Sequence, residues 1–261
     1  MKAKKSYGQH FLTNEGMAER IADSLTQAHE RVLEVGPGKG MLTKYLLEKN
    51  FKLKVVEADR DMVAYLQKFY PWLAANIIEG DFLKINLMEI FDGQSFALIG
   101  NFPYNISSQI VFKMVESRQL ISEMVGMFQR EMAERIIAPP GNKDYGVISV
   151  LTQAFYEGEM LFKVSRGNFN PPPKVESAVI RLKRKEKQQL DCNENLFRQI
   201  VKTTFGQRRK MLRNTLKSFV SDESMLEETF FQKRPEVLSV EDFIALTQRI
   251  QPFNPSTQPP K

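Results

Sequence analysis

The sequence has few of the residues that usually carry metal or nucleophilic chemistry. Its 261 residues include one cysteine, Cys192, and two histidines, His10 and His29. A single cysteine excludes an intrachain disulfide framework and a cysteine-rich zinc site, and it fits a reducing cytoplasm. Two histidines disfavour a histidine-based metal centre and a Ser-His-Asp triad. We therefore expect no metal in the site and a chemistry that uses other groups.

Long apolar runs are also absent. No stretch approaches the roughly 18 apolar residues that cross a bilayer, and MKAKKSYGQHF has no apolar segment after its lysines. We expect no membrane insertion, no secretion and a cytoplasmic location. Hydrophobic residues make up 42% of the chain, enough to build one full domain and a smaller one. Nothing suggests an obligate dimer, so we expect a monomer.

The order of the apolar segments predicts an α/β fold. Between residues 31 and 101, short apolar runs alternate with helix-like stretches, which is typical of βαβ units and a parallel sheet. EMVGMFQ (123–129) follows as a strand and YGVISVLTQAFYE (145–157) as a helix. MLFKVSR (160–166) and SAVIRLKR (177–184) are strands with only a loop between them, so we expect them to be antiparallel neighbours. The sheet should therefore end in a reversed hairpin.

After residue 187 the pattern changes to helices alone. Apolar residues recur at three- and four-residue spacing, as in a small bundle. We predict a first domain over residues 1–187 and a helical domain over 188–261, whose Pro-rich tail is disordered from about residue 252. The helices are expected at residues 194–205, 208–220, 223–231 and 240–250.

A glycine loop follows the first strand of the parallel region. In EVGPGKG, Gly36, Gly38 and Gly40 lie between a strand and a helix, where they allow close backbone approach and leave amide groups free for a ligand. The spacing differs from the dinucleotide fingerprint G-x-G-x-x-G, because the third glycine comes one position early. A simple tight turn is the alternative interpretation.

Two acidic residues follow the next two strands. Glu57 ends LKVVE about twenty residues after the loop, and a carboxylate there can accept hydrogen bonds from both hydroxyls of an adenosine ribose. Asp81, after the third strand, can bind the adenine amino group. Together with the glycine loop these residues predict an adenosine-binding site, but they fit both NAD and S-adenosylmethionine.

The fourth strand favours S-adenosylmethionine, because it ends in Asn101-Phe102-Pro103-Tyr104. Methylation of an adenine amine requires acceptors that hold the amine and favour a tetrahedral nitrogen. The side-chain oxygen of Asn101 and the carbonyl of Phe102 can supply them, while Pro103 restricts the turn. Tyr104 can stack on a flipped base, an interaction worth roughly 1–3 kcal/mol. The alternative is a strand-ending proline turn whose aromatics fill the core.

At this point the chain resembles the KsgA family of small-subunit ribosomal RNA adenine dimethyltransferases, from about residue 5 to residue 250. The motifs that carry the resemblance are GQHFL, EVGPGKG, VVEAD, EGDF, NFPYNISS, FNPPPKVES, FGQRRKMLRNTL and RPEVLSVEDF. The family usually has Q-N-F-L and N-L-P-Y where this chain has His10 and Phe102.

The resemblance implies a Rossmann-like, seven-stranded methyltransferase domain with a reversed terminal strand, followed by a small helical domain. It implies S-adenosylmethionine as the cofactor, and as the substrate two adjacent adenosines in the hairpin loop near the 3′ end of 16S rRNA in an assembling small subunit. Asn101 and Tyr104 would also meet the target adenine, and Phe169 would cover its other face. The cofactor contacts it implies are His10, Leu12, Gly36, Glu57, Asp81 and Asn101.

The positive charge of the chain is concentrated in one segment. The formal net charge is +6, but residues 181–217 carry twelve Lys or Arg against three acids, a local +9 that leaves the rest at −3. This pattern favours a polyanionic partner, although a solvated helix face is the alternative. The phosphate-binding candidates are Arg208, Arg209, Lys210, Arg213 and Lys217.

Three other functions compete with a small-subunit dimethyltransferase. An erythromycin-resistance type enzyme, which methylates 23S rRNA, resembles the same catalytic domain, but FGQRRKMLRNTL favours the first interpretation. A DNA adenine methyltransferase would need a target-recognition domain that the sequence lacks. A non-catalytic RNA-binding assembly factor would not need to retain Asn101, Tyr104, Glu57 and Asp81.

Overall fold

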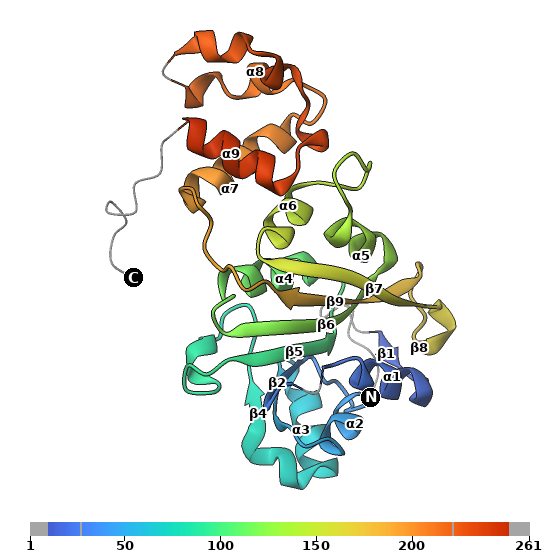
Figure 1. Ribbon diagram of the computed structural model, residues 1–261. Coiled ribbons are helices and arrows are strands. Elements are labelled where there is room, and N and C mark those ends of the chain that lie inside the picture. The colour runs from blue at the N-terminus through green and yellow to red at the C-terminus, as the bar shows by residue number, and fades with distance from the viewer. Residues whose placement is uncertain (1–9, 27, 221, 251–261) are drawn as a thin grey trace. The chain divides into compact units, whose positions relative to one another are not determined.

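The chain divides into two compact units. The computed structural model describes residues 10–26, 28–220 and 222–250 (Figure 1). The first unit comprises residues 1–134 and 156–185, and the second comprises 135–155 and 186–261. The tail predicted to be disordered lies outside the described residues.

The first unit contains a seven-stranded sheet in the order β4-β3-β2-β5-β6-β9-β7 (Figure 1). Neighbours from β4 to β6 are parallel, and β9 runs antiparallel to both β6 and β7. The predicted antiparallel pair is thus confirmed, and the reversed strand is the last in sequence but lies second from the edge. The strands are β2 (Arg31–Val35), β3 (Lys52–Glu57), β4 (Ile77–Glu79), β5 (Phe96–Asn101), β6 (Ile121–Gln129), β7 (Tyr156–Val164) and β9 (Ser177–Arg184).

Five helices accompany this sheet in the described part of the chain, namely α1 (Glu15–Asp23), α2 (Thr43–Leu47), α3 (Arg60–Phe69), α4 (Ser107–Glu116) and α5 (Arg130–Ile137), the last of which crosses into the second unit. A side-chain cap fixes the start of α3, because the Asp59 side chain accepts a hydrogen bond from the Asp61 amide. β5 is buried from Phe96 to Gly100, as expected for a parallel strand covered on both faces. β1 (Phe11–Leu12) and β8 (Phe169–Asn170) form a separate antiparallel pair.

The second unit begins earlier in the chain than the sequence boundary at residue 187. Residues 135–155, which were predicted to be part of the first domain, belong to it. Their polar and aromatic contacts explain this membership: the Gly141 amide donates to the Glu236 carbonyl at 2.7 Å, and the Tyr145 and Phe205 rings lie 5.9 Å apart. The helix predicted at residues 145–157 is shorter in the structure, as α6 (Val147–Gln153). The strand predicted to begin at residue 160 begins at Tyr156, as β7.

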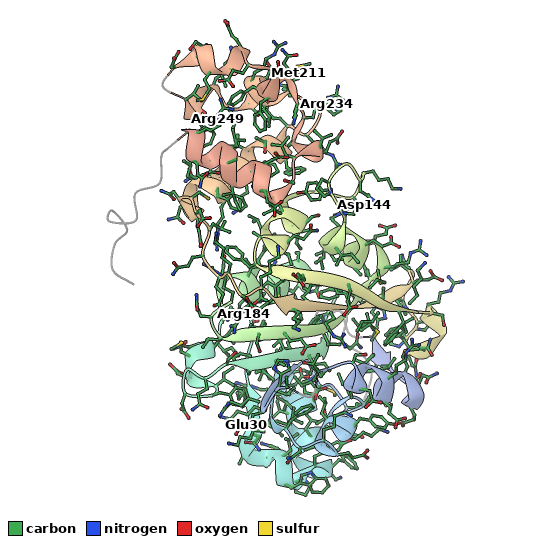
Figure 2. The ribbon with its side chains drawn as sticks, in the orientation of Figure 1. Glu30, Asp144, Arg184, Met211, Arg234 and Arg249 are labelled. Atoms are coloured by element: carbon green, nitrogen blue, oxygen red, sulfur yellow. The ribbon has the colours of Figure 1, made fainter. Side chains whose placement is uncertain are left out.

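Among the described residues of the rest of this unit, the α-helices are α7 (Glu194–Gly206), α8 (Leu212–Thr215) and α9 (Val240–Ile250). Asn193 caps α7, and Ser239 and Asp242 cap α9 reciprocally. Arg249, near the end of α9, pairs with Glu228 at 2.6 Å (Figure 2).

The predicted helices at 208–220 and 223–231 are wrong. The chain turns after α7, and the Leu212 amide donates to the Lys233 carbonyl at 2.9 Å, where a continuous helix would use the carbonyl of Arg208. Only the four residues of α8 and a 3-10 turn at Lys217–Phe219 remain helical. Residues 223–232 form two 3-10 turns separated by Glu228, whose backbone is extended.

Candidate active site

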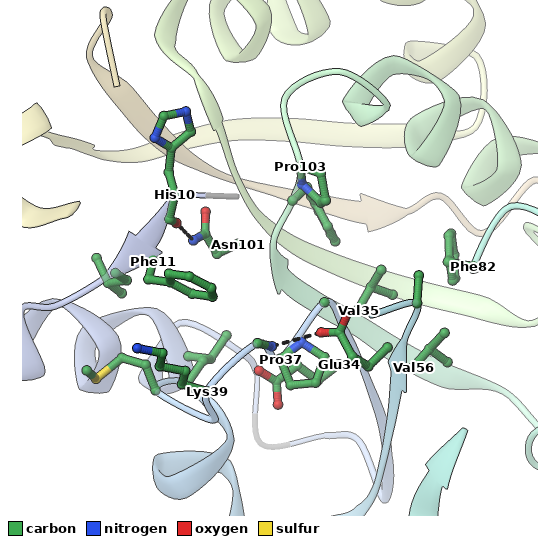
Figure 3. A pocket seen from close by; sticks show the side chains of 18 of the residues that line it. His10, Phe11, Glu34, Val35, Pro37, Lys39, Val56, Phe82, Asn101 and Pro103 are labelled. Carbon is green, nitrogen blue, oxygen red and sulfur yellow. Dashed lines mark hydrogen bonds between the residues drawn. The ribbon is translucent and has the colours of Figure 1, made fainter. Parts of the chain in front are cut away.

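A cavity of about 750 Å³ lies at the carboxyl ends of the parallel strands, entirely within the first unit (Figure 3). It is in the size range of small-molecule and cofactor sites. Residues from many separate stretches of the first unit line it, from His10 to Asn170. The predicted residues among them are His10, Leu12, Gly36, Gly38, Glu57, Asp81, Asn101, Phe102, Pro103 and Tyr104.

The glycine loop can follow its path only because Gly38 and Gly40 lack side chains. Gly38 and Gly40 have φ values of +55° and +79°. A Cβ on Gly38 would lie 3.1 Å from the Phe11 ring, and one on Gly40 would lie 2.6 Å from the Tyr70 ring. The loop is therefore packed between two aromatic rings, and its backbone lies on the cavity wall.

The two carboxylates are held by backbone amides. Glu57, which is 6% exposed, accepts hydrogen bonds from the Gly38 amide at 3.0 Å and the Asp59 amide at 2.9 Å. Burial raises the pKa of Glu57, and these amides oppose the shift. Asp81 accepts from the Leu83 amide at 2.9 Å. Each carboxylate is thus oriented and keeps lone pairs for a ribose hydroxyl or an amino group.

The orientation of the Asn101 amide is set from far along the chain. Its Nδ2 donates to the carbonyl of His10 at 3.0 Å, as the dashed line in Figure 3 marks. With the donor end engaged, Oδ1 is the acceptor that Asn101 can offer to a substrate.

Phe102 and Tyr104 are anchored differently from each other. The Phe102 ring is 1% exposed and packs 5.2 Å from the Phe128 ring. A Cβ on Gly126 would lie 2.4 Å from that Phe102 ring, so the ring occupies space over a glycine in the sheet. Because the Phe102 side chain is in the core, only its backbone can serve a substrate. The Tyr104 hydroxyl lies 2.6 Å from Oγ of Ser177.

Phe169 does not line the cavity in the part of the chain that the structure describes. It is 4% exposed and packs in the core with Leu12, Ala18 and Ile21. Its neighbour Asn170 lines the cavity instead. The role of Phe169 as a second ring on the base stays a prediction.

Glu34 is a site residue outside the set predicted from the sequence. It lies on β2 directly before the glycine loop, is 1% exposed and lines the cavity. Its Oε2 accepts from Oγ1 of Thr43 at 2.7 Å. Burial raises the pKa of Glu34 to about 8, assisted by the charge of Glu57. A lone acid inside the apolar run RVLEV was the signal that could have identified it.

The predicted basic cluster lies in the second unit, and its members differ. Nε of Arg208 pairs with Glu236 at 2.8 Å, and its Nη2 donates to the Asn142 carbonyl at 3.1 Å, so Arg208 joins parts of that unit. The other four candidates, Arg209, Lys210, Arg213 and Lys217, are exposed. Arg209 and Arg213 would share a face of the helix predicted at 208–220, but Arg209 precedes α8 and the two do not share a helix.

Metal-binding clusters and membrane-spanning helices are both absent from the described residues. Within them no group of three or more His, Cys, Asp or Glu side chains is arranged to hold a metal ion. None of the helices they form is long and apolar enough to cross a membrane.

The sheet order, the cavity at its carboxyl edge and the acids beside the glycine loop define a Rossmann-like fold with an adenosine-binding site, as in methyltransferases that use S-adenosylmethionine. The branch of this class follows from a family comparison. Residues 1–251 match the model of the ribosomal RNA adenine dimethylase family, and the chain belongs to this family. The predicted fold, cofactor and enzyme class are thereby confirmed.

Several relatives are similar over nearly the whole chain. A protein named ribosomal RNA small subunit methyltransferase A from Bacteroides thetaiotaomicron is 54% identical, over 96% of this chain and 95% of its own. One of the same name from Flavobacterium johnsoniae is 54% identical, over 96% and 97%. A solved dimethyladenosine transferase from Plasmodium falciparum has a TM-score of 0.77 at 28% identity, covering 92% of this chain and 98% of that one. The solved structure of the 23S rRNA methyltransferase ErmE has a TM-score of 0.69 at 26% sequence identity. The match covers 92% of this chain and 99% of ErmE.

Proposed function

We propose that this protein transfers two methyl groups to N6 of each of two adjacent adenosines in the hairpin loop near the 3′ end of 16S rRNA. It acts on the assembling small ribosomal subunit, in the cytoplasm and as a monomer. The observation that carries the chemistry is the Asn101 amide, whose donor end is bound by the His10 carbonyl. The small-subunit target is supported by the names of the relatives that are 54% identical.

The cofactor site is formed by the glycine loop, Glu57 and Asp81. We assign the ribose hydroxyls to Glu57 and the adenine amino group to Asp81, because both carboxylates are fixed by backbone amides. When bound, S-adenosylmethionine supplies an electrophilic methyl group on a positively charged sulfur.

The role of the protein in the reaction is to hold the target amine. The lone pair of adenine N6 is delocalised into the ring and is a poor nucleophile. Oδ1 of Asn101 and the carbonyl of Phe102 accept hydrogen bonds from its two hydrogens and favour a tetrahedral nitrogen. No strong base is required, because the nitrogen becomes acidic once it is methylated and loses its proton to water.

Tyr104 receives the flipped base on its ring. Its hydroxyl is bound to Ser177, so the ring is fixed at its outer end. Stacking on such a platform returns roughly 1–3 kcal/mol of the cost of removing the base from its neighbours. Arg209, Lys210, Arg213 and Lys217, exposed in the second unit, provide phosphate contacts that are largely independent of sequence.

The experiment is a methylation assay with two substrates. The protein is incubated with S-adenosylmethionine and purified small subunits that lack the modification, and the rRNA is analysed by mass spectrometry. We expect dimethyladenosine at two neighbouring positions of 16S rRNA and none in large subunits treated in the same way. Modification of 23S rRNA would instead establish the alternative that the likeness to ErmE raises. Absence of any methylation, with RNA binding retained, would favour a non-catalytic assembly factor.

A further inference from the structure

The imidazole of His10 contacts the ring to which we assign the target base. The ring centroids of His10 and Tyr104 lie 5.4 Å apart with an interplanar angle of 26°, which is a stacked arrangement. Both residues line the cavity. In Figure 3 the imidazole points away from Pro37 and Lys39, so the side chain is directed away from the glycine loop.

The same imidazole also contacts the loop between β8 and β9. Its Nδ1 lies 2.9 Å from the carbonyl oxygen of Pro171, so Nδ1 carries a proton and donates it. At the far end of this loop, Ser177 is fully buried and binds the Tyr104 hydroxyl. Tyr104 is thus held on one face by His10 and at its hydroxyl by Ser177.

We infer that the His10 imidazole is a positioning residue for the target base: it sets the plane of the Tyr104 ring and joins that ring to the Pro171 carbonyl. The inference rests on the proposed function, since it assigns the adenine to Tyr104. It gives the side chain of His10 a role separate from that of its backbone, whose carbonyl orients Asn101. Any residue at position 10 supplies that carbonyl, but only an aromatic one supplies the ring.

The His10 side chain provides a ring that stacks on Tyr104 and a donor for the Pro171 carbonyl, and three substitutions separate these two contributions. His10→Ala removes both the ring and the donor, His10→Phe keeps a ring for Tyr104 and removes the donor, and His10→Asn keeps a side-chain donor and removes the ring. We expect His10→Ala and His10→Asn to raise KM for small subunits by about three- to tenfold, as the removal of one aromatic neighbour predicts. His10→Phe should stay within about twofold of the wild type. KM for S-adenosylmethionine should change less than KM for subunits in every case.

A matched control tests for a general loss of stability. The Arg20 guanidinium lies 3.9 Å from the centre of the Phe162 ring, an interaction within the same unit that does not involve the cavity-lining residues. Arg20→Ala removes this interaction without touching Tyr104, so KM for subunits should not rise. A similar rise in Arg20→Ala would show that any disturbance of this unit has the same effect, and would overturn the inference.

Two other outcomes would also overturn it. The inference fails if all three His10 variants have the wild-type KM for subunits, or if His10→Asn is normal while His10→Phe is impaired, since the donor and not the ring would then matter. These outcomes differ from failure of the proposed function, in which the wild-type protein itself does not methylate 16S rRNA.

Discussion

Replacing Glu34 with glutamine should change how the stability of the first unit depends on pH. Glu34 is buried beside the cavity, and burial raises its pKa to about 8 from an ordinary value of 4.5. Between these two values the carboxyl is protonated in the folded protein and ionised in the unfolded chain. The folded state therefore binds one more proton, and raising the pH across this window lowers the free energy of unfolding. Glutamine resembles the protonated acid in shape and cannot titrate.

The expected magnitude follows from linkage. One proton of difference changes the free energy of unfolding by about 1.4 kcal/mol per pH unit, so the wild type should lose about 3 kcal/mol relative to Glu34→Gln between pH 5.5 and 7.5. The glutamine amide keeps an acceptor for the Thr43 hydroxyl, which donates to Glu34 at 2.7 Å. The prediction concerns the difference in slope, because the extra amide hydrogen can shift the stability of the variant at every pH.

The assay is urea unfolding followed by circular dichroism at pH 5.5, 6.5 and 7.5, without cofactor. Glu30→Gln is the matched control, since the Glu30 side chain is 55% exposed (Figure 2) and its pKa is lowered by hydrogen bonding to Lys52 and by the charge of Arg31. Glu30 is ionised in both states over this range, so Glu30→Gln should run parallel to the wild type. Parallel curves for Glu34→Gln as well would mean that Glu34 is ionised in the folded protein, and would refute the reasoning.

Three further predictions concern catalysis, RNA binding and the stability of the second unit. Asn101→Ala should abolish methyl transfer while calorimetry still detects cofactor binding at least in part; wild-type turnover would show that the amine is held elsewhere. Changing Arg209, Lys210 and Arg213 together to alanine should weaken RNA binding and reduce the log–log salt slope by up to about one for each phosphate that is no longer neutralised, and an unchanged slope would contradict a phosphate-binding role. Arg208→Ala should instead lower the melting temperature of the second unit, because Arg208 pairs with Glu236, and a melting temperature equal to that of the wild type would contradict this.

The sheet could be predicted because each strand carries its own signal. β9 coincides with the predicted strand at residues 177–184. The acids at the ends of the parallel strands could be placed at one edge of the sheet without information about distant contacts, because parallel strands end at the same edge. The antiparallel pairing of β7 with β9 followed from the short connection alone.

The helical region could not be predicted in the same way. Three- and four-residue spacing of apolar side chains is satisfied by one long helix or by several short turns. Here tertiary hydrogen bonds decide, since the Leu212 amide binds the Lys233 carbonyl and Arg208 binds Glu236. These partners are more than twenty residues away, and local periodicity contains no information about them.

The candidate site shows the same division. The motifs predicted Asn101, Glu57 and Asp81 from their residue type and their place at or after the end of a strand, and all three line the cavity. The raised pKa of Glu34 and the burial of Phe169 depend on the residues packed around them. The sequence alone therefore could not predict either one.

Residues 10–12 form part of the candidate site, because three of their contacts fix groups to which we assign a part in the reaction. The carbonyl of His10 binds the Asn101 amide, which lies 91 residues away. Phe11 packs on Gly38 in the glycine loop, and β1 pairs with β8 next to the Pro171 carbonyl that binds the imidazole. Without this segment the Asn101 amide would lose the partner that distinguishes its nitrogen from its oxygen, and half of its orientations would present a donor to an amine that is itself a donor. We therefore expect the acceptor geometry that we propose for methyl transfer to depend on residues 10–12.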